Sequence, residues 1–161
     1  MPMRKHTVWT DGSCLGNPGY GGWAAIFFKS SFGEDYPTPY HRMIGSEVLT
    51  TNNRMEMQAF IEALRYIKPD DHVRIVTDSS YVVDGATKWY KKWVSNKWKG
   101  VANVDLWHTL LDEIAKHKRV EFCWIKGHDG YKWNEECDVL AKAAAKDLRK
   151  QDKGECYKGG E

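Results

Sequence analysis

Apolar and polar residues alternate along the first third of the chain in a way that predicts strands. Residues 5–11 predict a strand leading into a turn, and residues 21–29, GGWAAIFFK, predict an apolar strand with aromatic residues. Residues 40–49 predict a third strand, and the glycine and prolines of residues 30–41 predict the turn before it. Because the connections are short, we expect these three strands to pair antiparallel.

Helical spacing begins after residue 51 and then alternates with short strands. One helix face is formed by apolar residues of RMEMQAFIEALRYI, namely Met57, Phe60, Ile61, Leu64 and Ile67. Further strands are predicted at 72–77 and 119–126, and further helices at about 80–92, within DLWHTLLDEIAKH, and at about 134–148. Strands separated by helices add in parallel. The predicted fold is therefore mixed α/β (α+β), a five-stranded mixed sheet with helices on both faces.

Length and composition favour one domain. The 161 residues predict a single domain over residues 1–150, followed by a polar, glycine-rich tail at 151–161 that we expect to be flexible. The four cysteines show no C-x-x-C or zinc spacing, which predicts reduced thiols and a cytoplasmic protein. No apolar run approaches roughly 18 residues, so no membrane span is expected, and nothing demands more than a monomer or an obligatory protein partner.

A basic and aromatic segment stands out against a net charge of only +2. Residues 88–99 carry five lysines and no acid, and four of the eight tryptophans fall between Trp89 and Trp107. Lysines interleaved with aromatic residues suit a nucleic-acid surface. Composition alone favours the simpler alternative, a helix whose tryptophans pack into the core and whose lysines are solvated.

Four acidic residues occupy the positions where sites form in open sheets. Asp11 and Asp78 end predicted strands, while Glu56 and Asp138 lie in the first turns of predicted helices. Each has an ordinary alternative: a turn residue for Asp11, a capping box with Asn53 for Glu56, a helix cap for Asp78, and an exposed acid for Asp138.

Taken together, the four acids indicate a metal site. Carboxylates that converge on one rim repel one another and raise each other's pKa, which a cation would relieve. Oxygen ligands select hard ions such as Mg²⁺ or Mn²⁺. Two ions about 3.5–4 Å apart form the arrangement that hydrolyses phosphodiesters by in-line displacement.

Five ordered blocks resemble a known family. TDGSCLGNPG, TTNNRMEM, VTDSSYV, NVDLW and IKGHDGYKWNEECDVLA closely resemble ribonuclease H type 1 of the bacterial kind, from about His6 to Leu148. The resemblance implies the same mixed sheet and an endonuclease that hydrolyses the RNA strand of RNA/DNA hybrids. It further implies two Mg²⁺ ions bound with substrate, Mn²⁺ as a substitute, and products with 5′-phosphate and 3′-hydroxyl ends.

The resemblance also implies residue roles. The metal-binding acids would be Asp11, Glu56, Asp78 and Asp138, and the histidine of KGHDG, His128, would help to move protons during catalysis. The residues implied to bind substrate are Gly12, Ser13, Cys14, Asn17, Asn52 and Asn53 at the RNA strand, Thr51 and Asn103 at a DNA phosphate, and Trp89, Lys91, Lys92 and Trp93 in a basic handle beside the DNA strand. For Trp93 and Trp98, packing of the handle onto the domain is an equal alternative.

One departure and three alternative functions bear on this interpretation. Family members often carry arginine two residues before the phosphate-pocket threonine, where this chain has Leu49, so we expect either a weaker pocket or a neighbour such as Arg42 that supplies the charge. A nuclease of the same fold that acts on DNA is disfavoured by the KGH loop and the handle. A non-catalytic nucleic-acid-binding module would not need all four acids. A dinucleotide site is excluded because Gly19, Gly21 and Gly22 open a strand rather than a helix.

Overall fold

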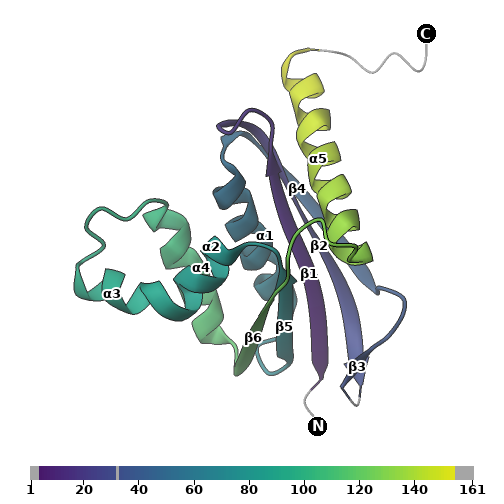
Figure 1. The fold of residues 1–161 in the computed structure, drawn as a ribbon, viewed down its shortest axis with the longest axis vertical. Coiled ribbons are helices and arrows are strands. Elements are labelled where there is room, and N and C mark those ends of the chain that lie inside the picture. The colour runs from purple at the N-terminus through teal and green to yellow at the C-terminus, as the bar shows by residue number, and fades with distance from the viewer. Residues whose placement is uncertain (1–3, 32, 155–161) are drawn as a thin grey trace.

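The computed structural model describes residues 4–31 and 33–154 (Figure 1). The strands are β1 (Lys5–Cys14), β2 (Gly19–Ser31), β3 (Glu34–Asp35), β4 (His41–Thr50), β5 (His72–Thr77) and β6 (Arg119–Trp124). The helices are α1 (Asn52–Tyr66), α2 (Ser80–Asp84), the π-helical turn η1 (Gly85–Trp89), α3 (Tyr90–Ser95), α4 (Val104–Lys116) and α5 (Lys132–Asp152).

The described strands form one mixed sheet with the expected topology. β2 pairs antiparallel with β1 and β4, whereas β5 lies parallel to β1 and β6 parallel to β5. The two-residue strand β3 also pairs with β2, so the sheet has six strands rather than the expected five. A strand this short is below the length at which alternation can be recognised in a sequence.

Helices cover both faces of the sheet, which explains the apolar run of β2. On one face, Ala25 and Phe27 pack into a large core with α1 and α4. On the other, Ala24, Ile26 and Phe28 pack against α5 (Figure 1). Since successive side chains of a strand point to opposite faces, a strand covered twice must be apolar at nearly every position.

Three boundaries differ from the sequence prediction. β1 continues past Asp11 to Cys14, because residues 11–14 pair with residues 21–24 of β2. α5 begins before residue 134 and ends at Asp152, so it includes the first two residues of the expected tail, while residues 155–161 of that tail lie outside the described part. The helix expected at 80–92 is divided into α2, η1 and α3.

The π-helical turn begins at a close contact with the core. A Cβ atom on Gly85 would lie 2.1 Å from Cη2 of Trp107. The Trp107 side chain is fully buried, and its Nε1 donates to the Tyr81 hydroxyl at 3.1 Å, so the ring is held in place. Gly85 therefore allows α2 and η1 to approach α4 closely. Beyond this contact, α3 projects away from the sheet (Figure 1).

We predict that Gly85→Ala lowers the free energy of unfolding by about 2–3 kcal/mol, because the added methyl group overpacks the Trp107 ring. Helix propensity alone would predict that alanine raises the free energy of unfolding, because alanine favours helix more than glycine does. Urea denaturation followed by circular dichroism measures the difference, with Lys88→Ala, an exposed change in the same turn, as the control. A Gly85→Ala protein as stable as the wild type would show that the Trp107 ring can move aside.

Candidate active site

Three carboxylates from distant parts of the chain meet at one end of the sheet. Asp11 belongs to β1, Glu56 to α1, and Asp78 follows β5 directly. One oxygen from each lies within 4.8 Å of the others. Asp11 and Glu56 are only 4% and 7% exposed. Such burial of neighbouring acids is costly for a protein unless a cation or a proton compensates the charge.

The strand register brings Asp11 and Asp78 together. Trp9 lies opposite Val76 in the parallel β1–β5 pair, and β5 ends at Thr77. Asp11 lies two residues after Trp9, and Asp78 lies two residues after Val76. Asp11 is still within β1, and Asp78 is the first residue after β5, so the two acids lie side by side. The prediction that Asp11 ends its strand was wrong, but the prediction that the two acids are adjacent is confirmed.

Gly12 lets α1 approach β1. Its backbone N–H donates to Glu56 Oε1 at 2.9 Å, and a Cβ atom at this position would lie 2.4 Å from the Glu56 backbone nitrogen. The N-cap of α1 is Thr51, whose Oγ1 accepts from Arg54 N–H at 3.2 Å. The alternative of an Asn53–Glu56 capping box is therefore wrong, and Glu56 is free to face the other acids.

Asp78 is held by contacts that the sequence did not reveal. The cap of α2 is Ser79 rather than Asp78, so the capping alternative is wrong here too. Asp78 Oδ2 accepts from the buried Asn134 amide at 3.3 Å. A Cβ atom on Gly127 would lie 2.6 Å from the same oxygen, so glycine gives the carboxylate its space. Neither Asn134 nor Gly127 stands out in a single sequence, because their roles depend on the fold.

The electrostatics of the cluster favour a bound cation. Burial, with the negative charges of Asp78 and Asp138 adding to it, raises the pKa of Asp11 to about 7. Burial and the neighbouring Asp11 raise the pKa of Glu56 well above its ordinary value. Glu56 Oε2 is buried without a hydrogen-bond partner among the described residues. A buried, unpaired oxygen within an all-carboxylate set is the ligand arrangement that suits a hard divalent ion.

Asp138 and His128 line the same cavity, of about 400 Å³, without joining the three-carboxylate cluster. Asp138, on α5, accepts from Lys142 Nζ at 2.9 Å. His128 is exposed in the loop before α5 and has a left-handed backbone, with φ of 55°. Both predicted residues therefore border the cluster from the side of α5.

The residues expected at the RNA strand lie at the start of α1 and along β1. Asn52, Asn53, Gly12 and Ser13 line the cavity. Asn17 does not line it, but its Oδ1 accepts from the Asn52 N–H at 2.9 Å, which joins the β1–β2 turn to α1. The Cys14 thiol donates to the Thr50 carbonyl at 3.2 Å.

Arg54 joins the two residues expected to grip a phosphate. Its backbone N–H is capped by Thr51, and its Nη1 lies 3.4 Å from Asn103 Oδ1. Arg42 is not that cation, contrary to the expectation from Leu49: it lies at the other end of β4, where it pairs with Glu136 at 3.5 Å. Nine extended residues separate positions 42 and 51, about 30 Å. The TTNNRMEM block contained Arg54, but only the fold places it beside Asn103.

The handle combines buried packing with exposed charge. Trp93 lies between Trp98 and Trp107, with ring centroids 5.9 and 5.0 Å away, so it packs the handle onto the core. Trp89 keeps 43% of its surface exposed, and Lys91 and Lys92 are exposed on α3. The structure thus supports the packing alternative for Trp93 and leaves Trp89 accessible.

Comparison with known proteins identifies the family. The model of the RNase H family matches residues 3–146. The chain belongs to the RNase H family. It is 47% identical over 143 residues to a ribonuclease H of Idiomarina loihiensis, covering 86% of each chain. It is 45% identical to a ribonuclease H of Novosphingobium aromaticivorans, covering 89% of this chain and 98% of that one.

A solved structure supports the same assignment. LC9-RNase H1, described as a type 1 RNase H with the type 2 active-site motif, superposes with a TM-score of 0.78 at 33% identity, covering 91% of this chain and 74% of that one. Membership of the RNase H family makes the protein a nuclease, a hydrolase that acts on nucleic acid and depends on metal. Within residues 4–31 and 33–154, no helix has the length and apolar character needed to cross a membrane.

The raised pKa of Asp11 predicts a pH-dependent penalty in the metal-free protein. The unfolded chain releases this proton near pH 4, whereas the folded protein keeps it up to about pH 7. The folded state therefore loses stability as pH rises between these values. We predict that Asp11→Asn becomes progressively more stable than the wild type over this range, by up to about 2–4 kcal/mol.

Urea unfolding in EDTA at several pH values measures this difference. Asp112→Asn, which removes an exposed carboxylate of α4, is the matched control and should show a small difference that does not change with pH. A stability gain for Asp11→Asn that is independent of pH would contradict the assigned cause.

Proposed function

We propose that the protein hydrolyses the RNA strand of RNA/DNA hybrids at the Asp11–Glu56–Asp78 cluster, with Mg²⁺ as its ion. The observation that carries this proposal is the convergence of three carboxylates, two of them buried, on one open cavity. A structural role would not require acids to be gathered where they repel one another. Membership of the RNase H family adds the substrate class.

Four acids would hold the metal: Asp11, Glu56 and Asp78 at the centre, and Asp138 from α5 after release from Lys142. When bound, a pair of Mg²⁺ ions would activate the attacking water and stabilise the leaving oxygen, giving 5′-phosphate and 3′-hydroxyl ends. Gly12 N–H orients one oxygen of Glu56 and Asn134 orients one of Asp78, so the chain fixes the ligands before any ion arrives.

His128 is proposed to move protons at the edge of this site. The His128 side chain is exposed, and an imidazole can both donate and accept a proton, so it can exchange protons with solvent during turnover. Its loop borders the cavity that Asp138 also lines, which supports a role beside the proposed metal site. This role is separate from metal binding, because His128 is not one of the three clustered ligands.

Strand selection is proposed to rest on the start of α1 and on the basic handle. Asn52 and Asn53 line the cavity and offer amide groups to the ribose 2′-hydroxyls that distinguish RNA from DNA. Asn17 holds the Asn52 backbone and so positions this edge. The backbone of residues 12–14 runs alongside, where glycine allows close approach.

The DNA strand would lie toward the handle. We propose that Thr51 and Asn103 bind a phosphate there. Arg54 would supply the positive charge that relatives often provide from an arginine at the position of Leu49. Arg54 is also paired with Asp105 through two contacts, 2.9 and 2.7 Å, which fix its guanidinium in place. Trp89, Lys91 and Lys92 would extend this contact. Trp93 would hold the handle in place by packing against Trp107.

We predict that the full chain cleaves a labelled RNA/DNA hybrid in Mg²⁺ and not in EDTA, and that Asp78→Asn lowers the rate by at least about 10³-fold without lowering the melting temperature of the metal-free protein. Gel analysis of products from hybrid, duplex RNA and duplex DNA measures both activity and specificity. Asp112→Asn should retain full activity. Equal cleavage of all three duplexes, or a large loss of stability in Asp78→Asn, would overturn the assignment.

A second prediction concerns the handle. If Lys91 and Lys92 contact phosphates, the double alanine variant should flatten the slope of log affinity against log salt by about one unit per lost contact. Fluorescence anisotropy of a labelled hybrid in Ca²⁺ or EDTA measures the slope without cleavage. Lys146→Ala/Lys150→Ala removes the same charge from exposed positions of α5 and should leave the slope unchanged. Identical slopes for the handle variant and the wild type would exclude the contact.

A further inference from the structure

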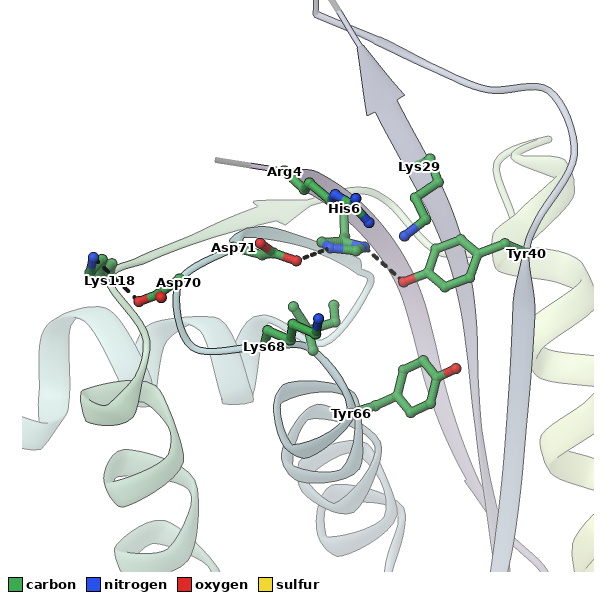
Figure 2. Close-up of a pocket in the computed structure, with 10 residues that line it drawn as sticks. Arg4, His6, Lys29, Tyr40, Tyr66, Lys68, Asp70, Asp71 and Lys118 are labelled. Carbon is green, nitrogen blue, oxygen red and sulfur yellow. Dashed lines mark hydrogen bonds and ion pairs between the residues drawn. The ribbon is translucent and has the colours of Figure 1, made fainter. Parts of the chain in front are cut away.

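A second cavity, of about 710 Å³, lies at the opposite end of α1 from the acidic cluster. It is bordered by the start of β1, by the end of α1 and by the turn into β5 (Figure 2). Glu56 and Tyr66 are ten residues apart on α1, so the two sites are separated by about 15 Å along the helix. None of the residues lining this cavity has a part in the proposed hydrolysis.

The cavity wall is rigid because its buried histidine is bonded on both sides. His6 is 4% exposed, with Nε2 at 2.8 Å from Asp71 Oδ2 and Nδ1 at 2.7 Å from the Tyr40 hydroxyl (Figure 2). Asp71 is therefore already paired. The other carboxylate, Asp70, is paired as well, with Lys118 Nζ at 3.3 Å. The hydrogen bond from His6 does not remove the charge of Asp71, so the cavity lining holds two carboxylates, Asp70 and Asp71, against four basic side chains, Arg4, Lys29, Lys68 and Lys118.

The remaining charges around the cavity are positive. Arg4, Lys29 and Lys68 line it, and no carboxylate in the described part of the chain lies within ion-pair distance of them. Lys29 Nζ lies over the Tyr40 ring, 4.3 Å from its centroid, which directs the ammonium group inward (Figure 2). Burial lowers the pKa of His6, and the charges of Lys29 and Arg4 add to that effect, so their field reaches the cavity wall.

We propose that this cavity binds a small phosphate monoester, with the phosphate held by Arg4, Lys29 and Lys68. Three cations without carboxylate partners match a dianion with several acceptor oxygens. The volume is within the usual range for small-molecule sites and exceeds that of a phosphate group, which leaves room for an organic part beside Tyr66 and Asp70.

A nucleic-acid strand suits the cavity less well. A continuous backbone would have to pass both Asp70 and Asp71, and a bounded cavity does not offer the extended basic groove that tracks a strand. The C-terminus of α1 also carries partial negative charge, so an anion must sit toward Arg4 and Lys29 rather than over the helix end. A single phosphate can lie wholly on the side of Arg4 and Lys29, whereas a chain of phosphates would also extend toward the end of α1 and the two carboxylates.

The test is an amide NMR titration of the full chain in EDTA, with adenosine 5′-monophosphate as the probe. We expect saturable millimolar binding with shifts at residues 4–6, 29 and 66–71, and no such response to adenosine, which lacks the phosphate. Lys29→Gln/Lys68→Gln should weaken binding at least about tenfold, because two charge-assisted contacts are lost. Lys146→Gln/Lys150→Gln, with the same change in net charge, should bind as the wild type does.

Four results would overturn the proposal. These are an equal response to adenosine, unchanged affinity in the Lys29/Lys68 variant, shifts confined to the Gly12 and Asn52 region, and tighter binding of a short oligothymidylate at the same residues. The last result would identify the surface as a strand contact. The residues mutated or expected to respond lie at the other end of α1 from the carboxylate cluster, so loss of hydrolysis in variants of that cluster has no bearing on this outcome.

Discussion

Mutual repulsion among Asp11, Glu56 and Asp78 is the constraint on which the rest of the structure depends. Separate elements bring the three acids together, with one oxygen of each within 4.8 Å of the others. β1 and β5 are fixed in register by the sheet, and α1 is pinned to β1 through Gly12. The protein accepts this unfavourable electrostatic free energy at its active site and offsets it with the core packed on both faces of the sheet.

α1 connects the functional regions. Its first turns carry Glu56, the cavity-lining asparagines and the Thr51 cap, and its buried face forms much of the main core. Arg54 links it to Asn103 and Asp105 at the base of the handle. Its C-terminal end borders the second cavity, which is lined by Arg4, Lys29 and Lys68. A shift of this helix would therefore disturb the carboxylate cluster and the cavity-lining asparagines together, whereas the handle packs through its own group of tryptophans.

Much of the fold could be predicted from the sequence because period-two and helical patterns are local. The order of the main strands and helices followed from spacing, and strand ends indicated where acids would converge. What could not be predicted depends on contacts between distant segments. The extension of β1 beyond Asp11 requires its pairing with β2, and the π-helical turn begins where Gly85 meets Trp107.

The candidate site divides in the same way. The candidate metal-binding acids were recognisable, since sites form where strands of an open sheet end. Asn134, Gly127 and Arg54 were not, because an amide, a glycine and an arginine acquire their roles only from what the fold places beside them. The cavity lined by Arg4, Lys29 and Lys68 draws its residues from five separate segments, and no motif in the sequence joins them.

The most direct test of the central claim is calorimetric titration of the protein with Mg²⁺ in buffers of different ionisation enthalpy. If a cation replaces the proton that repulsion and burial hold on the cluster, binding at about pH 6 releases protons, and the release decreases as pH rises through about 7, where Asp11 loses its proton. Asp11→Asn should bind Mg²⁺ much more weakly and release fewer protons. Heats that do not depend on the buffer at either pH, with unchanged affinity in Asp11→Asn, would contradict the claim that repulsion among these carboxylates creates the metal site.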